Sequence, residues 1–299
     1  MSIKRFIVRY LGVYYMLLAS IAFAFTGAFA KVVSADIPSV EVVFFRNFIG
    51  LLLIGFAIFK NPVRQKGGKP WLLFFRGFAG AISILAFFYN IANMGLAEAF
   101  TFSKTAPIFV SFIAALFLKE KLSFISWFAI LGGFIGIIFV MQPELGFKKT
   151  DVMGILNGFF AALAYLSVHD LRKYYDTKVI VLSFVLIGSV TPLMLMIVSE
   201  FFVIPAYFDF MAAKFVLPKL SSWTLIILMG ICGILYQTYL TKAFAASKKA
   251  GPVAVISYSD IIFTMILGLF LGDSLPNMLG ALGIILIIIS GIAVAMDNK

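Results

Sequence analysis

Residues 116–122 read Leu-Phe-Leu-Lys-Glu-Lys-Leu, and residues 269–275 read Leu-Phe-Leu-Gly-Asp-Ser-Leu. The second stretch follows the first at an offset of 153 positions (269 − 116). The same offset aligns Ala97 with Ala250, so the similarity extends upstream of both stretches. Repetition over so long an interval predicts a chain made of two related halves.

The composition places both halves in a membrane. Of the 299 residues, 63% are apolar and only 12% are charged, and the mean hydropathy is +1.08. A soluble domain is nearer half apolar and a quarter charged. A soluble protein this apolar would expose a large apolar surface to water, so the apolar side chains that cannot be buried must face lipid. The composition therefore predicts an integral membrane protein.

Ten apolar segments are long enough to cross a bilayer, which takes roughly 20 residues of helix. Prolines, glycines and charged residues separate these segments, as turn-forming residues do. The predicted helices cover residues 11–33, 37–59, 71–94, 97–118, 123–142, 152–171, 179–203, 223–246, 250–271 and 276–296. Neighbours joined by very short turns must run antiparallel.

The repeat and the helix count together predict the topology. We expect the first repeat to span residues 1–147 and the second to span residues 148–299, with five helices each. Because five is odd, the second half enters the membrane from the opposite side. The expected fold class is therefore an all-α membrane protein with ten transmembrane helices, arranged as two inverted five-helix repeats.

The positive charge is distributed unevenly between the two sides of the membrane. With the N-terminus inside, the inner segments hold 16 of the 24 Lys and Arg residues and the outer segments hold 5. The other three, Arg46, Arg76 and Lys104, lie within predicted helices. This bias predicts a multi-pass protein of the cell inner membrane with both termini in the cytoplasm. The net charge of +11 thus reports topology and not binding of nucleic acid.

Enzymatic functions have little support in the sequence. The chain has one Cys and one His, and it lacks the P-loop, zinc-protease and nucleophile-elbow motifs. We therefore expect no enzyme, no metal and no cofactor. A membrane-embedded enzyme acting on lipid would need a polar catalytic cluster, and a channel would need rings of like groups from several subunits.

Several short runs carry a family resemblance. They are Ala-Glu-Ala at 97–99, Ala-Pro-Ile-Phe at 106–109 and Ala-Leu-Phe-Leu-Lys-Glu-Lys-Leu at 115–122. The corresponding runs in the second half are Ala-Gly-Pro-Val-Ala-Val at 250–255 and Gly-Leu-Phe-Leu-Gly-Asp-Ser-Leu at 268–275. With these runs, nearly the whole chain resembles the drug/metabolite transporter superfamily, in its ten-helix EamA branch.

The resemblance implies a transporter whose two halves rock around a cavity near the membrane midplane. It names no substrate, because relatives in this superfamily move amino acids, nucleotide sugars, vitamins and organic cations. The second half departs from the family pattern at two positions. Asp273 stands where glutamate is usual, and Asp260 stands where the first half has Pro107.

Ionisable residues inside a bilayer are costly and mark functional sites. Thr101 and Lys104 share one face of the helix at 97–118, because they are three positions apart. Ser257 and Asp260 do the same on the helix at 250–271, with Tyr258 beside them. The resemblance places these two helices on either side of the central cavity. Lys104 would attract a carboxylate or phosphate and Asp260 an amino group, or the two pair only with each other.

Further polar and aromatic residues are expected around the same cavity, and others are expected to brace or gate it. The expected substrate-binding set is Lys104, Asp260, Ser257, Tyr258, Thr101, Asn90, Tyr165, Tyr236, Gln237 and Ser20. The expected structural or gating set is Pro107, Arg46, Glu120 and Asp273. Arg76 lies one turn inside its helix, so we expect it to extend to the inner headgroups.

These observations predict a secondary-active transporter that works by alternating access. Its expected substrate is a small polar or zwitterionic metabolite, such as an amino acid or a related compound. The alternatives are a larger or anionic solute (S-adenosylmethionine, riboflavin or a carboxylate) and a lipid flippase on the same fold. We expect partnership with the lipid bilayer, protons as the coupling ion and a monomer or homodimer, and no nucleic acid.

Overall fold

A computed structural model of the chain describes residues 3–63, 67–117, 123–141, 148–205, 208, 213–246 and 256–297. Every regular element in these ranges is helical. The helices are α1 (Ile3–Val33), α2 (Ser39–Lys60), α3 (Pro70–Asn93), α4 (Leu96–Ser103), α5 (Ala106–Phe117), α6 (Phe124–Met141), α7 (Lys149–Leu171), α8 (Thr177–Phe201), α9 (Leu220–Ala246), α11 (Ser259–Phe270) and α12 (Met278–Asp297).

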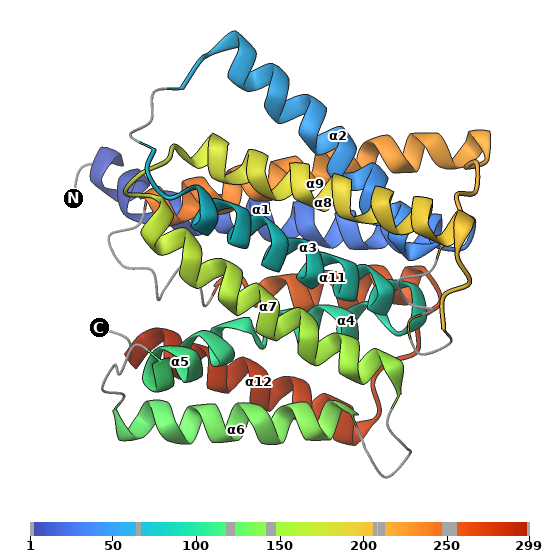
Figure 1. Cartoon of the computed structure of the whole chain (residues 1–299). Helices are drawn as coiled ribbons and strands as arrows, with labels where there is room; N and C mark the ends of the chain where they lie inside the picture. Colours follow the sequence, from blue (N-terminus) through green and yellow to red (C-terminus); the bar gives the residue numbers. More distant parts are fainter. Residues whose placement is uncertain are drawn as a thin grey trace.

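The ten predicted helical segments are confirmed. Eight stretches of the described chain are long and apolar enough to cross a membrane, when α4 and α5 are counted together as Leu96–Ile113. Two shorter apolar helices, Ser259–Phe270 and Met278–Ala293, complete the ten. The helices lie roughly side by side, and both chain termini are at the same end of the bundle (Figure 1). We call this end the terminal face and the other end the distal face.

The predicted helix at 97–118 differs from a regular span because it is broken in the middle. Its two parts, α4 and α5, meet at a turn formed by Lys104 and Thr105. Pro107 explains the break: it has no backbone N–H to continue the ladder, and it is tolerated in the first turn of a new helix. At the turn, the Phe102 carbonyl accepts hydrogen bonds from both the Thr105 N–H at 3.1 Å and the Thr105 hydroxyl at 2.6 Å.

The second half carries a matching break. Ser257 and Tyr258 form a turn immediately before α11, and they align with Lys104 and Thr105 at the 153-residue offset of the repeat. Within the described residues, each half therefore has a helix break at the same position of the repeat.

Helix packing follows the same two-fold pattern. α1 packs on α9 as α7 packs on α3, and α1 packs on α11 as α7 packs on α5. α2 pairs with its counterpart α8, and α6 pairs with its counterpart α12. The last pair lies at one edge of the molecule (bottom of Figure 1). Exchanging the halves exchanges these contacts pair by pair, as expected of two related halves.

An aromatic cluster joins the two halves in the interior. Phe23 of α1 lies 4.6 Å from Phe100 of α4, between ring centroids, and stacks on Tyr236 of α9 at 4.2 Å. Phe87 of α3 lies 5.0 Å from the Phe100 ring. Gly27 makes room for this packing, because a Cβ there would lie 2.5 Å from the Phe100 ring. Such ring pairs contribute about 0.5–1.5 kcal/mol each beyond their buried area.

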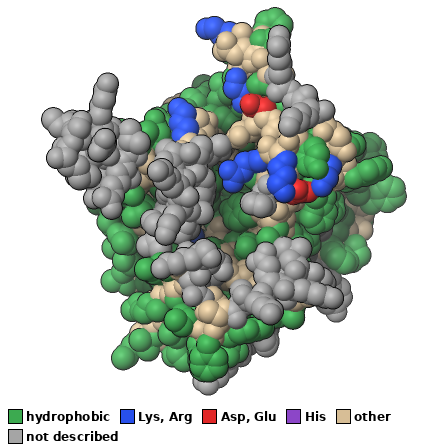
Figure 2. Space-filling model, turned by 90° about the vertical axis from the view of Figure 1, so that its left-hand side faces the viewer, with side chains coloured by type: hydrophobic (Ala, Val, Ile, Leu, Met, Phe, Trp, Pro, Cys, Tyr) green, Lys and Arg blue, Asp and Glu red, His purple; other side chains and the backbone are tan. Residues whose placement is uncertain are grey.

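The outer surface is apolar, as contact with lipid requires. Trp71, Phe124 and Phe270 are among the many large apolar side chains that are mostly exposed. On the terminal face, Lys and Arg side chains gather together with acidic ones in one region (Figure 2). A face rich in charged side chains together with a largely apolar outer surface is the pattern of a membrane-spanning protein.

A close helix contact joins α6 and α12 through two glycines. A Cβ added at Gly136 would lie 2.9 Å from the Gly283 carbonyl oxygen, and a Cβ at Gly283 would lie 2.7 Å from the Gly136 carbonyl oxygen. Small residues permit such close backbone approach between membrane helices.

We predict that Gly136→Ala destabilises the protein by about 1–3 kcal/mol, because the added methyl group meets backbone that cannot move aside. The measurement is the thermal unfolding midpoint of detergent-purified protein. Gly55→Ala is the matched control, because Gly55 is also in a helix but has nothing within 4 Å of its would-be Cβ. Equal midpoints for the two variants would contradict the close α6–α12 contact.

Candidate functional site: a polar cavity beside two broken helices

A buried ion pair joins the two broken helices. Nζ of Lys104 lies 2.6 Å from Oδ2 of Asp260, and both side chains are largely withdrawn from the surface. Lys104 caps the C-terminus of α4, and Asp260 is in the first turn of α11. A cation at a helix C-terminus and an anion at a helix N-terminus are each favoured by the helix dipole. The two residues therefore pair with each other here, which is one of the two alternatives that the sequence left open.

Further contacts hold the two breaks together. The Tyr258 hydroxyl donates a hydrogen bond to the Lys104 carbonyl oxygen, an acceptor that the break leaves without a helical partner, at 3.3 Å. The Thr264 hydroxyl donates to the Asp260 carbonyl at 2.7 Å. Gly291 of α12 makes space for Tyr258, because a Cβ at that position would overlap its phenol. Among the described residues, Oδ1 of Asp260 has no hydrogen-bond partner.

A polar cavity of about 60 Å³ lies between the halves next to this ion pair. Arg46 of α2 and Arg76 of α3 contribute its charged groups. The other polar side chains in its lining are Ser83, Ser103, Asn157, Tyr165, Tyr236 and Gln237. Both repeats therefore supply residues, and the lining combines cations, hydrogen-bonding groups and aromatic rings, as small-molecule sites do.

One aromatic layer separates the ion pair from the cavity. Nζ of Lys104 lies 5.9 Å from the centroid of Phe23, whose ring is part of the cavity wall. Phe23 stacks on Tyr236, which is another wall residue, at 4.2 Å between ring centroids. A change in the ion pair can therefore reach the cavity through the Phe23–Tyr236 stack.

The predicted binding residues fall into three groups. Tyr165, Tyr236 and Gln237 line the cavity. Lys104, Asp260, Ser257 and Tyr258 form the breaks beside it. Thr101, Asn90 and Ser20 are buried outside the lining, where Thr101 donates to Ala97 O at 2.8 Å and Asn90 donates to Thr150 O at 3.0 Å. Their role as binding residues stays a prediction.

The structure adds two arginines that the sequence argument did not place at a binding site. Arg46, expected to brace a neighbouring helix, lines the cavity. Arg76 was expected at the headgroups, and this was wrong: it is only 7% exposed and points into the protein. Asn157 of α7 donates to the Ser83 carbonyl of α3 at 2.9 Å and also lines the cavity. The sequence feature that could have indicated the inward orientation of Arg76 is Gly80, one turn later, which leaves room for the Arg76 guanidinium.

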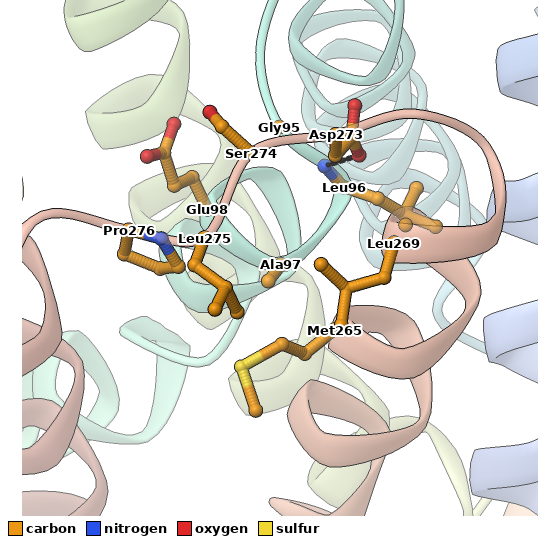
Figure 3. A pocket seen from close by; sticks show the side chains of 11 residues that line it. Gly95, Leu96, Ala97, Glu98, Met265, Leu269, Asp273, Ser274, Leu275 and Pro276 are labelled. Carbon is orange, nitrogen blue, oxygen red and sulfur yellow. Dashed lines mark hydrogen bonds between the residues drawn. The ribbon is translucent and has the colours of Figure 1, made fainter.

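Asp273 closes the distal face by joining three segments. Its carboxylate forms an ion pair with Lys31 at the end of α1 and accepts a hydrogen bond from the Leu96 N–H at the start of α4, at 2.8 Å (Figure 3). Lys31 also donates to the Met94 carbonyl at 3.0 Å. The cavity beside Glu98 encloses only about 10 Å³, which is room for at most about one water molecule. Glu120, the predicted counterpart of Asp273, lies outside the described residues.

A second cluster ties the halves together at the terminal face. Lys69, before α3, lies 2.5 Å from Asp170 at the end of α7, and Lys173 lies 3.2 Å from the same carboxylate. Hydrogen bonds from Lys69 and then Lys173 lower the pKa of Asp170. The hydrogen bond to Asp170 raises the pKa of Lys69.

These pKa shifts decide when the terminal-face tie holds. A lowered carboxyl pKa stabilises the tie above the unfolded value near 4, and this is lost as pH falls through the folded pKa. A raised Lys pKa stabilises the tie below the unfolded value near 10.4, and this is lost as pH rises through the folded pKa. The tie between Lys69 and Asp170 is therefore constant around neutral pH, where it cannot act as a pH sensor.

The fold and the cavity together define a membrane transporter. Residues 10–142 match the EamA-like transporter family. An "Uncharacterized transporter" of Helicobacter pylori is 34% identical over 290 residues, covering 95% of this chain and 94% of that protein. The chain belongs to the EamA-like transporter family and is not an enzyme.

Other relatives bear more specific names. The pseudopaline exporter CntI of Pseudomonas aeruginosa is 32% identical over 291 residues, covering 96% of this chain and 97% of that protein. An S-adenosylmethionine uptake transporter of Rickettsia bellii is 22% identical over 97% of this chain and 94% of its own. A solved crystal structure shares the fold with a TM-score of 0.58 at 20% identity, covering 96% of this chain and 97% of that one.

We predict that the Lys104–Asp260 pair is coupled in stability. Lys104→Met or Asp260→Leu alone leaves a charge buried without its partner and costs about 3–5 kcal/mol. The double variant, with both charges removed, should regain most of the lost thermal stability in detergent. If the double variant loses as much as the two single variants added together, the two side chains do not interact.

Proposed function

We propose that this protein moves a small polar or zwitterionic metabolite across the cytoplasmic membrane by alternating access. The observation that carries the proposal is the polar cavity of Arg46, Arg76, Tyr165 and Tyr236, which both repeats line beside their broken helices. Inverted repeats with discontinuous helices bind substrate in this place and expose it to each side in turn.

The size of the cavity supports a moving mechanism. Its volume of about 60 Å³ is below the roughly 300 Å³ at which small-molecule pockets begin. A metabolite therefore fits only when the lining helices move apart. The two ties provide the places for this movement: Lys31 and Leu96 of the first half meet Asp273 of the second, and Lys69 of the first half meets Asp170 of the second. Release of one tie at a time would open one face at a time.

The relatives' names support a solute as the substrate and leave the direction open, because one is an exporter and another an uptake transporter. We propose a proton as the coupling ion and Asp260 as its binding site. A proton on Asp260 would remove the charge that holds Lys104 and so loosen the join between the broken helices.

The alternating-access proposal is tested with disulfide locks. Cys232 is the single cysteine of the chain, so Cys232→Ser gives a clean background. One variant carries Lys31→Cys and Asp273→Cys, and the other carries Lys69→Cys and Asp170→Cys. We predict that oxidation of either pair stops counterflow in proteoliposomes and that reduction restores it, because a carrier needs both faces to open.

The probes are radiolabelled glutamate, lysine, riboflavin and S-adenosylmethionine. The same variants kept reduced are the controls for the substitutions themselves. Continued counterflow with either face locked would contradict alternating access. Movement of fluorescent phospholipid between leaflets, with no counterflow of any probe, would favour the flippase alternative.

A further prediction separates the coupling residue from the surface tie. Asp260→Asn should make counterflow insensitive to pH between about 5 and 9, because the variant has no carboxyl group to protonate. Asp170→Asn should keep the wild-type pH profile, because the terminal-face tie does not titrate in that range. An unchanged profile in Asp260→Asn would show that the proton binds elsewhere.

A further inference from the structure

Two arginines are buried inside the protein without a carboxylate partner among the described residues. Arg46 is 4% exposed and Arg76 is 7% exposed. Neither forms an ion pair with an acidic residue in the described part of the chain. The Nε atom of each also lacks a hydrogen-bond partner there. An unpaired buried cation is among the most costly arrangements in a protein.

The two guanidinium groups face the same space. Both residues line the cavity between the halves. Their Cζ atoms lie 5.6 Å and 4.9 Å from the centroid of one ring, that of Phe184 on α8. Contact with an aromatic face offsets part of the cost of burying a cation. The ring contact does not use the in-plane N–H donors of the guanidinium, which are the groups that bind oxyanions.

The charges around the cavity do not balance. Asp260 is the carboxylate next to it, and Lys104 already occupies that group at 2.6 Å. Glu41, also buried on α2, accepts the Val216 N–H at 3.0 Å and is not within ion-pair distance of either arginine. Arg46 and Arg76 therefore remain as two positive charges that nothing in the described residues neutralises.

Local packing holds both arginines in place. Nη1 of Arg46 donates to Oδ1 of Asn47 at 2.7 Å, and Nδ2 of Asn47 donates to the Gly188 carbonyl at 3.1 Å. Gly233 leaves space for Arg46, since a Cβ there would lie 2.8 Å from its Nε. Gly80 does the same for Arg76, with a would-be Cβ 2.5 Å from its Nη1. Such positioning is expected of a binding group, because it limits the entropy lost when a ligand binds.

We propose that Arg46 and Arg76 form an anion subsite, and that the transported solute carries at least one oxyanion group, a carboxylate or a phosphate, which these arginines bind. The inference rests on the proposed transport function and narrows its substrate class. Arginine suits this role because its planar fork of donors matches two oxygens of a carboxylate or phosphate. Tyr165, Asn157 and Gln237 supply hydrogen-bonding groups for the rest of the solute.

Ligand binding to the whole, detergent-purified chain tests the subsite without requiring transport. The probes are glutarate, L-glutamate and inorganic phosphate, with 1,5-diaminopentane as a cationic compound of the same carbon number as glutarate. Thermal shift at increasing millimolar concentration gives an apparent affinity for each probe. We expect stabilisation by at least one oxyanion and none by the diamine. Comparing the apparent affinities for glutarate and for phosphate shows whether the subsite prefers a carboxylate or a phosphate.

The variants are Arg46→Gln, Arg76→Gln and Gly233→Ala. The last keeps both charges and displaces Arg46, so it reports on position when charge is constant. Each should weaken the apparent affinity for the oxyanion at least about tenfold, as expected for the loss of charged hydrogen bonds. Lys242→Gln is the control, because Lys242 is an exposed cation over the Tyr15 and Tyr239 rings, away from the cavity lining, and should bind as wild type.

Three results would overturn the subsite: no stabilisation by any of the oxyanions, stabilisation by the diamine, or oxyanion binding that survives both arginine substitutions. Size-exclusion profiles of the variants confirm that each is folded before its binding is compared. The outcome separates the two proposals. Arginine-dependent binding without counterflow would keep the subsite and refute transport, and counterflow that both arginine variants retain would keep transport and refute the subsite.

Discussion

The ion pair between Lys104 and Asp260 is the interaction on which the architecture depends. A helix cannot be interrupted in the middle of a bilayer unless its freed polar groups find partners, because lipid offers none. Here the second half supplies the partners for the break in the first: Tyr258 donates to the exposed carbonyl of Lys104, and Asp260 pairs with the Lys104 side chain. The two repeats are therefore joined where each of them is locally weakest.

This junction explains why the cavity is located where it is. The breaks lie between the halves, and the aromatic stack of Phe23 and Tyr236 separates them from the polar space lined by Arg46 and Arg76. Two kinds of buried charge thus lie side by side with different roles. One pair is internally neutral and holds the fold together, whereas the arginines carry charge that a ligand can neutralise. A solute that supplies negative charge would stabilise the loaded state, and its departure would restore the imbalance.

Sequence patterns predicted the number of helical segments and the division into two halves, because hydropathy determines the first and repetition indicates the second. The offset that relates residues 116–122 to residues 269–275 also relates the two helix breaks, and Pro107 indicated one of them. The binding surface was harder to predict because it depends on which helix faces approach. Arg76 is near enough to a helix end for its long side chain to reach either the headgroups or the interior. Only the packing of α3 against α7 and α8, with Gly80 leaving room, decides between them.

Contacts at the two ends of the bundle connect this chemistry to movement. If the halves rock about the junction of the broken helices, the distal and terminal faces must open in opposition. Spin labels measure this directly in the Cys232→Ser background, with one pair at Asn93 and Ser274 on the distal face and another at Lys60 and Arg172 on the terminal face. In liposomes, the account predicts two distances for each pair, with the longer distance at one face accompanied by the shorter at the other as pH or solute shifts the populations. A single unchanging distance at both faces, under conditions where solute is transported, would contradict it.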